Sequence, residues 1–215
     1  MKRTQILGAV FVAVLVVSAC AISPALAVES TWLVDGAVPT ATQEVDSEWD
    51  SAKLSIVDLK GGIFGEEVVI LCPGNDLGTI GPGKADSLTS FTITSCELMV
   101  SVCPEPLVEV INLPWTSSIV LIGGTFYDDI TSTAGTKMVG YNVLCNNIVE
   151  DTCEVALVQP QLVSNFNGQV EAVFNSADAN QPRANCSRGG TGAGLISGTD
   201  LILSEVGLSV AISEG

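Results

Sequence analysis

Residues Glu66 to Trp115 read EEVVILCPGNDLGTIGPGKADSLTSFTITSCELMVSVCPEPLVEVINLPW, and this stretch decides the predicted fold. It contains three cysteines and four β-rich runs, which are separated by Gly, Pro, Asn and Asp. Runs of Val, Ile and Thr bounded by such residues are typical of short strands. In an oxidising compartment, cysteines placed between short strands act as covalent links. The stretch therefore predicts disulfide-linked β structure.

The same pattern continues to the end of the chain. Apolar and β-branched runs recur about every 8 to 12 residues, and no amphipathic helix is indicated. Asn167-Gly168 lies between two such runs and supplies the positive φ angles that a tight hairpin needs. We expect an all-β fold, a single-domain antiparallel β-sandwich or barrel of about ten to twelve short strands over residues 44–215. Residues 28–43 are expected to form a looser N-terminal arm.

The first residues of the chain have the pattern of an export signal. Lys2 and Arg3 precede an apolar run that extends from Ile6 to about Ile22, and Ala25 and Ala27 occupy small-residue cleavage positions. We expect a signal peptide over residues 1–27, cleaved after Ala27. No later stretch is apolar for long enough to span a bilayer, so no transmembrane helix is expected in the mature chain.

A second processing route is open at the same end of the chain. The sequence Val17-Ser18-Ala19-Cys20 resembles the bacterial lipobox, in which the cysteine is lipidated and becomes the mature N-terminus. Cys20 is therefore an alternative lipidation site, and the protein would then be an anchored lipoprotein. Both routes place the protein outside the cytoplasm, either secreted or in the cell envelope.

The net charge limits the partners of the protein. Removal of the signal peptide leaves 24 acidic and six basic residues, a formal charge of −18. This charge repels phosphate backbones, so we expect no nucleic acid among the partners. A solvated acidic surface that keeps an exported protein in solution is the simplest interpretation. An extracellular or cell-wall ligand remains open.

Six cysteines remain after the signal peptide, and their number and spacing favour disulfides. The chain has no histidine, and close pairs of cysteines that could hold zinc are absent. Six cysteines allow fifteen pairings. From the short spacings we expect one bridge between Cys96 and Cys103 and another between Cys145 and Cys153. Elimination then leaves Cys72 with Cys186.

One acidic run is a candidate calcium site. In the sequence EVDSEWD, the residues alternate, so that Glu44, Asp46, Glu48 and Asp50 fall on one face of an extended strand. Such a row of carboxylates can gather Ca²⁺, although more often it only faces water, and the loop that an EF-hand requires is missing. The other face of this strand would carry Trp49. We expect Trp32 and Trp49 to be exposed and Trp115 to lie in the core.

The composition excludes enzyme chemistry that depends on histidine. Without histidine there is no Ser-His-Asp or Cys-His catalysis. A glycosidase-like hydrolase would need a carboxylate pair, and Asp128, Asp129, Glu109 and Glu171 are candidates of low specificity. Asp128 and Asp129 would point to opposite faces of a strand. Residues 78–84 match the glycine and lysine spacing of a P-loop but lack the following hydroxyl, so we interpret them as a turn and expect no cofactor.

The order of these features resembles a group of uncharacterised exported, cysteine-containing β-rich proteins of high-GC Gram-positive bacteria. The resemblance rests on a tryptophan near the mature start, the paired cysteines in CELMVSVC, and the tripeptide Leu113-Pro114-Trp115, followed by the later cysteines and glycines. It implies the fold and the compartment but no catalytic residue. We therefore expect a non-catalytic cell-envelope or extracellular module. A carboxylate-dependent extracellular hydrolase and a Ca²⁺-binding surface domain are the alternatives.

Overall fold

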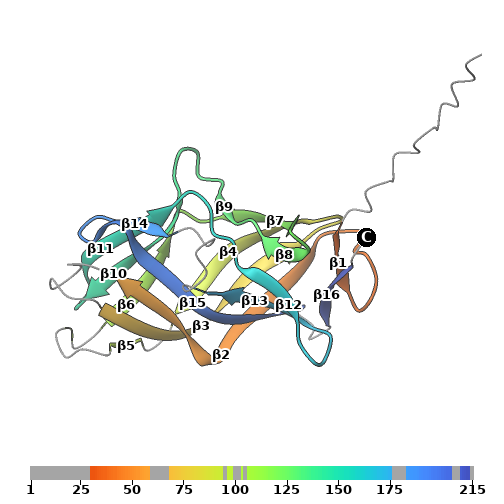
Figure 1. Cartoon of the computed structure of the whole chain (residues 1–215), viewed down its shortest axis with the longest axis horizontal. Helices are drawn as coiled ribbons and strands as arrows, with labels where there is room; N and C mark the ends of the chain where they lie inside the picture. Colours follow the sequence, from red (N-terminus) through yellow and green to blue (C-terminus); the bar gives the residue numbers. More distant parts are fainter. Residues whose placement is uncertain are drawn as a thin grey trace, which may run out of the picture.

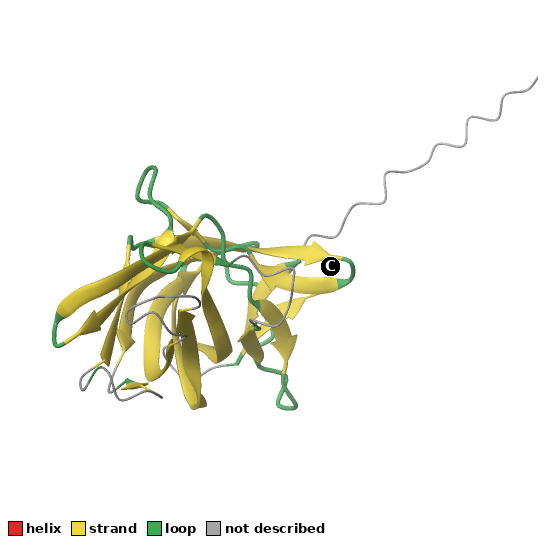
Figure 2. Ribbon diagram, turned by 60° about the vertical axis from the view of Figure 1, so that its left-hand side comes forward, coloured by secondary structure: helices red, strands yellow, loops and turns green. Residues whose placement is uncertain are grey.

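The computed structural model describes residues 30–58, 68–93, 96–98, 103, 106–175, 183–204 and 209–213. Within these ranges every regular element is a strand, as Figure 2 shows. The strands are β1 (Thr31–Val34), β2 (Gln43–Asp58), β3 (Val68–Ile80), β4 (Ala85–Ile93), β5 (Glu97–Leu98), β6 (Pro106–Ile111), β7 (Trp115–Ile122), β8 (Thr125–Asp128), β9 (Thr131–Ser132), β10 (Val139–Cys145), β11 (Ile148–Val155), β12 (Gln161–Ser164), β13 (Val170–Phe174), β14 (Ala184–Cys186), β15 (Gly190–Ser204) and β16 (Val210–Ser213). The predicted export signal and Cys20 lie outside the described residues.

Eight strands close into a ring. The antiparallel order β13-β12-β8-β7-β4-β3-β2-β15 returns to its start because β13 also pairs with β15. Strands β14, β11, β10 and β6 continue the sheet from the first part of β15 and form the other end of the molecule (Figure 1). The predicted all-β antiparallel class, a sandwich or barrel, is confirmed. No helix in the described part of the chain is long and apolar enough to cross a membrane.

Three strands are much longer than expected and belong to both ends of the molecule. β2 has 16 residues, β3 has 13 and β15 has 15. The sequence suggested breaks at their glycines, but Gly78 continues β3 because its missing Cβ lets the backbone of Ser87 come close. Bulges bend β2 between Trp49 and Leu54 and β15 between Ser197 and Leu201.

The expected N-terminal arm is partly built into the fold. β1 pairs with β16, which brings the two ends of the described chain together beside the ring (Figure 1). Trp32 has no exposed surface and packs with Val34, Val45 and Val210 in one core cluster. The expectation that Trp32 is exposed is wrong, because β16 and the ring cover it.

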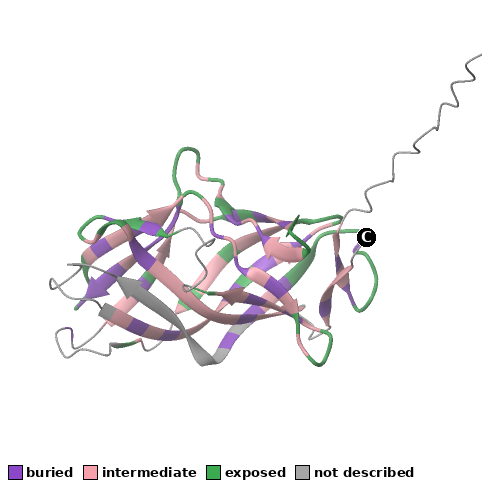
Figure 3. Ribbon diagram, in the orientation of Figure 1, coloured by how far each residue is buried: buried purple, intermediate pink, exposed green. Residues whose placement is uncertain are grey.

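Buried side chains alternate with partly exposed ones along the strands, as the colouring in Figure 3 shows. The alternation predicted around Trp49 holds, since Val45, Ser47 and Trp49 are all buried on the inner face of β2. Trp49 is only 4% exposed, so its expected exposure is also wrong. Trp115 lies in the core at 8% exposure, as predicted.

All six described cysteines form disulfides, but none of the three predicted pairings is present. The bridges join Cys72 with Cys96, Cys103 with Cys145, and Cys153 with Cys186. The predicted pairs were Cys96 with Cys103, Cys145 with Cys153, and Cys72 with Cys186, and they are corrected here.

Strand topology explains the correction. After β4 the chain continues along β3 through the short strand β5, which places Cys96 with its Cα 4.3 Å from that of Cys72. Cys145 and Cys153 lie in one hairpin but at different positions along it, since Cys145 is opposite Ile148. Cys153 lies directly opposite Cys186 in the β11–β14 pair. Neighbours across a sheet, rather than along the sequence, therefore decide the pairing.

Candidate functional site

Four aspartates point into the interior of the molecule, each from a different strand of the ring. They are Asp76 on β3, Asp86 on β4, Asp128 on β8 and Asp200 on β15. We refer to these four residues as the carboxyl cluster. Asp76, Asp128 and Asp200 are between 4% and 7% exposed. Asp86 is more exposed as a residue, but its Oδ1 atom is buried.

The sheet register places a serine beside two of the four aspartates. Ser47 on β2 lies directly opposite Asp76, and Ser117 on β7 lies directly opposite Asp86. Directly opposite residues have side chains on the same face of a sheet, here the inner one. Both serines are buried. The two pairs therefore add hydroxyl groups to the interior carboxyls.

The cluster borders an interior cavity of about 90 Å³. We call it the central cavity, because residues from all three core clusters line it. Its wall is mostly apolar, with Val, Ile and aromatic side chains, and all four aspartates of the carboxyl cluster take part in it. Such a volume is several times that needed for one water molecule.

Asp76 and Asp200 form a coupled pair. Burial, and then the charge of Asp200, raise the pKa of Asp76 well above its ordinary value of 3.8. Burial also raises the pKa of Asp200 to about 6, against the opposing effects of Ser47 and of a hydrogen bond from Asp76. Of the two carboxyl groups, Asp76 therefore has the stronger tendency to retain a proton. The nearby Ser47 hydroxyl lowers the pKa of both groups, and its buried oxygen has no hydrogen-bond partner of ordinary geometry.

Asp86 and Asp128 form the second pair. Burial, followed by the charges of Asp128 and Asp76, raises the pKa of Asp86 well above its ordinary value. Burial raises the pKa of Asp128 to about 7, while the Ser117 hydroxyl opposes this shift and the charge of Asp129 adds to it. The repulsion between Asp86 and Asp76 links the two pairs. At neutral pH the cluster holds protons that ordinary carboxylates have lost.

The cluster has no basic neighbour among the side chains that the structure describes. Lys84, Lys137, Arg183 and Arg188 are all exposed. Buried oxygen atoms without a hydrogen-bond partner remain on three of the aspartates, namely Oδ1 of Asp86, Asp128 and Asp200. Buried polar atoms are normally satisfied, so this concentration of unsatisfied acceptors marks the cavity as a candidate site.

Aromatic rings form part of the cavity wall. Phe91 lies between Trp49 and Trp115, with ring centroids 5.9 Å and 5.0 Å away. The indole N–H of Trp49 donates to the backbone oxygen of Cys72 at 2.9 Å, and that of Trp115 to Ile111 at 3.1 Å. These bonds fix both indoles, so the wall beside the carboxyl cluster is preorganised.

Only one of the four predicted catalytic candidates reaches this site. Asp128 faces the central cavity, whereas Asp129 points away and accepts a hydrogen bond from Gln159 at 2.6 Å. Glu109 is exposed, and Glu171 is bonded to Asn165 at 3.2 Å beside a hairpin. Asp128 ends β8 and Asp129 follows it outside the strand, and the structure does not bring the four candidates together.

The predicted calcium row remains only partly described. Glu44 is exposed and Asp46 is half-buried, with Asn75 donating to its carboxylate at 3.5 Å. The side chains of Glu48 and Asp50 lie outside the described residues, although their backbone belongs to β2. A calcium site on this face stays a prediction.

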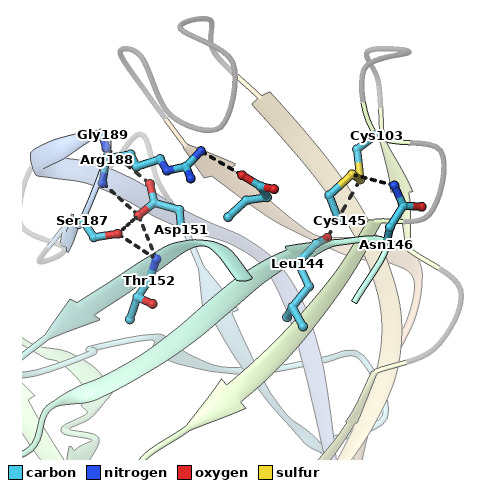
Figure 4. A network of polar contacts seen from close by, with 10 residues as sticks. Cys103, Leu144, Cys145, Asn146, Asp151, Thr152, Ser187, Arg188 and Gly189 are labelled. Carbon is cyan, nitrogen blue, oxygen red and sulfur yellow. Dashed lines mark hydrogen bonds and ion pairs between the residues drawn. A yellow bond between two sulfur atoms is a disulfide. The ribbon is translucent and has the colours of Figure 1, made fainter. Parts of the chain in front are cut away.

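A further buried carboxylate, Asp151, lies outside the carboxyl cluster and has a structural role (Figure 4). It accepts hydrogen bonds from the backbone N–H groups of Thr152 at 2.7 Å, Arg188 at 2.9 Å and Gly189 at 3.3 Å, and from the Ser187 hydroxyl. These bonds fasten the turn after β14 to β11.

The same carboxylate is close to two sulfur atoms, but this arrangement is not a metal site. Asp151, Cys153 and Cys186 have their potential ligand atoms within 4.8 Å of one another. The two sulfurs are bonded to each other at 2.01 Å, so neither is available as a thiolate. In the described part of the chain this is the one such group, and the carboxyl cluster does not meet the same distance criterion.

The sequence did contain a signal for the three aspartates that were missed. Each lies an even number of residues from an inward-facing apolar residue of its strand, and therefore on the same face, as in Asp86-Ser87-Leu88 and Asp200-Leu201-Ile202. An acid at an inward position of a strand contradicts simple binary patterning, and such violations mark functional sites.

Tyr141, which lines the central cavity, packs closely against Gly194 of β15. A Cβ at Gly194 would lie 2.7 Å from the Tyr141 hydroxyl and 2.9 Å from the Cys186 sulfur.

Comparison of the chain with protein-family models, curated proteins and solved structures gave no match.

Proposed function

We propose that the protein is an exported, non-catalytic binding module of the cell envelope or extracellular space, whose strand ring holds a small ligand. The observation that carries this proposal is the central cavity, with four carboxyl groups directed into it. Rings of eight strands are wide enough to enclose side chains or one small ligand. The three disulfides and the charged, apolar N-terminal sequence support export.

The size of the cavity argues against a hydrolase acting on extracellular polymer. Pockets that hold drug-sized ligands have volumes of roughly 300–1,000 Å³. The central cavity, at about 90 Å³, is well below this range. The coupled pair of Asp76 and Asp200 does have the raised pKa that acid catalysis uses. Its position favours binding of a small molecule over cleavage of a glycan.

The proposal is tested with the full chain expressed behind its own N-terminal sequence in a Gram-positive host. Mass spectrometry of the exported product should show three disulfides and an N-terminus at Val28, or a lipidated Cys20. Neither product should turn over glycan substrates. Retention of the chain in the cytoplasm would overturn export. Glycan turnover that is lost in Asp128→Asn would replace the binding module with the hydrolase.

A further inference from the structure

We propose that the central cavity binds a small aliphatic ammonium cation, with the carboxyl cluster as its counter-charge. This inference rests on the proposed function, since it names the ligand class of the same site. Three observations carry it: the unsatisfied acceptors, the cavity volume and the composition of the wall.

The acceptors are fixed before any ligand arrives. Oδ1 of Asp128 and Oδ1 of Asp200 are buried without a partner, on residues that are 5% and 7% exposed. Both residues line the central cavity, as does the buried Ser47. An ammonium group offers up to three N–H donors and a positive charge, which match several acceptors on different strands. Among the side chains that the structure describes, no basic group supplies N–H donors or a positive charge to these acceptors.

The arrangement favours an organic cation over a metal ion. Calcium takes six to eight oxygen ligands that converge on one point. The carboxylates of the cluster do not come within 4.8 Å of one another in any group of three. Most of the wall is apolar, including Val108, Ile130 and Ile202, and would leave much of a metal ion without ligands. An alkyl chain, in contrast, gains from such a wall.

The cavity volume limits the size of the cation. A cavity of roughly 150 Å³ in another protein holds the six carbons of benzene. In proportion, about 90 Å³ holds about four heavy atoms. Propylammonium has that size. The contacting rings of Trp49, Phe91 and Trp115 add apolar surface and attract cations to their faces.

Binding of a cation should release protons. The cluster holds protons at neutral pH because its aspartates are buried and repel one another. A positive charge in the cavity reverses this effect and favours the ionised carboxylates. Affinity for the ammonium ion should therefore rise with pH through the range in which Asp200 and Asp128 ionise. Further charged groups that the structure describes beside these strands are Lys84, just before β4, Asp46 and Asp129, on the outer faces, and Glu171, opposite Leu201 of β15.

The experiment compares propylammonium with 1-propanol, which has the same number of heavy atoms but no charge. Binding to the disulfide-intact chain is followed at about pH 7.5 by NMR of the three indole N–H groups and by calorimetry in two buffers of different ionisation enthalpy. Trp49 and Trp115 line the cavity, whereas Trp32 does not and serves as an internal control. We expect propylammonium to shift the first two signals, to bind at least about tenfold more tightly than 1-propanol and to release protons.

Isosteric variants separate charge from packing. Asp128→Asn and Asp200→Asn should each weaken propylammonium binding at least about tenfold and leave 1-propanol binding within about twofold. The surface variant Asp35→Asn should bind as the wild type does. Urea unfolding of each variant establishes that it is folded. An unfolded variant is replaced by Ser47→Ala, which removes a hydroxyl from the same wall and should also weaken ammonium binding.

The outcomes distinguish the two proposals. Equal or tighter binding of 1-propanol would overturn the ammonium assignment and leave the small-ligand module in place. If neither propylammonium nor 1-propanol shifts the indole signals of Trp49 and Trp115, both proposals are overturned. Calcium, added at equal ionic strength, should leave the signals of Trp49 and Trp115 unchanged. A calcium-induced shift of both, lost in Asp200→Asn, would replace the organic cation with a metal ion.

Discussion

Replacing Asp128 with asparagine should make the protein more stable at alkaline pH. The asparagine keeps the shape of the side chain but never ionises. In the folded protein burial raises the pKa of Asp128 to about 7, whereas the ordinary value is 3.8. Stability from the protonated form is complete below the unfolded pKa and is lost as pH rises through the folded pKa. The whole shift corresponds to an upper limit of about 4 kcal/mol in unfolding free energy.

The loss of stability with rising pH can be measured well above the isoelectric point of the chain, which is near pH 4.1. Between about pH 5.5 and about pH 8.5 the unfolded chain has already lost the Asp128 proton, while the folded protein loses it within this range. Integration over the range gives about 2 kcal/mol of lost stability in the wild type. Asp128→Asn lacks this loss and also removes a repulsion that raises the pKa of Asp86.

The assay is urea unfolding followed by tryptophan fluorescence at both pH values, with disulfides intact. The wild type should lose about 2 kcal/mol more than Asp128→Asn between the two conditions. Asp35→Asn removes one exposed acidic charge and serves as the control, with the pH dependence of the wild type. Parallel pH profiles for the wild type and Asp128→Asn would refute a buried carboxyl with a raised pKa at this position.

Three further predictions concern the scaffold. Gly194→Ala should lower the unfolding free energy by about 1–3 kcal/mol, because the added Cβ would meet the Tyr141 hydroxyl at 2.7 Å. Gly81→Ala, whose Cβ would make only ordinary contacts, with the Ala85 oxygen at 3.8 Å, should lower it by less than about 1 kcal/mol in the same urea titration. Asp151→Ala should lower the unfolding free energy by about 3 kcal/mol, because it leaves buried N–H groups unpaired. Glu150→Ala breaks only an exposed ion pair and should lower it by less than about 1 kcal/mol. Equal losses of the two variants in thermal unfolding would contradict this difference. Peptide mapping without reduction should recover the three observed bridges, and any fragment joining two other cysteines would disprove the topology.

Local patterns in the sequence were sufficient for the strand class and for the orientation of individual strands. The alternation correctly predicted that Val45 and Ser47 share the face of Trp49, because period-two alternation is a local property. The same alternation left Trp49 open to an interpretation as an exposed residue. Which face is covered depends on the distant strands that complete the ring.

The disulfides and the carboxyl cluster depend on the register between strands that are far apart in sequence. Cys153 and Cys186 are opposite one another only because β14 pairs with β11. Similarly, Asp76 and Asp200 come from strands on either side of β2. Sequence spacing carries no information on such neighbours. Asp200 lies two residues before the inward-facing Ile202, so the sequence could have predicted that Asp200 faces inward. It could not have predicted that Asp76 is its neighbour.

The closure of the ring by β15 affects the order in which the fold can form. β2 begins at Gln43, and its partner β15 ends at Ser204, so the hydrogen bonds between them join nearly the two extremes of the described chain. The ring cannot close before the residues of β15, up to Ser204, are free to pair with β2. Pairings of such high contact order form slowly. A nascent molecule that stays unfolded for this long would suit the export that we propose.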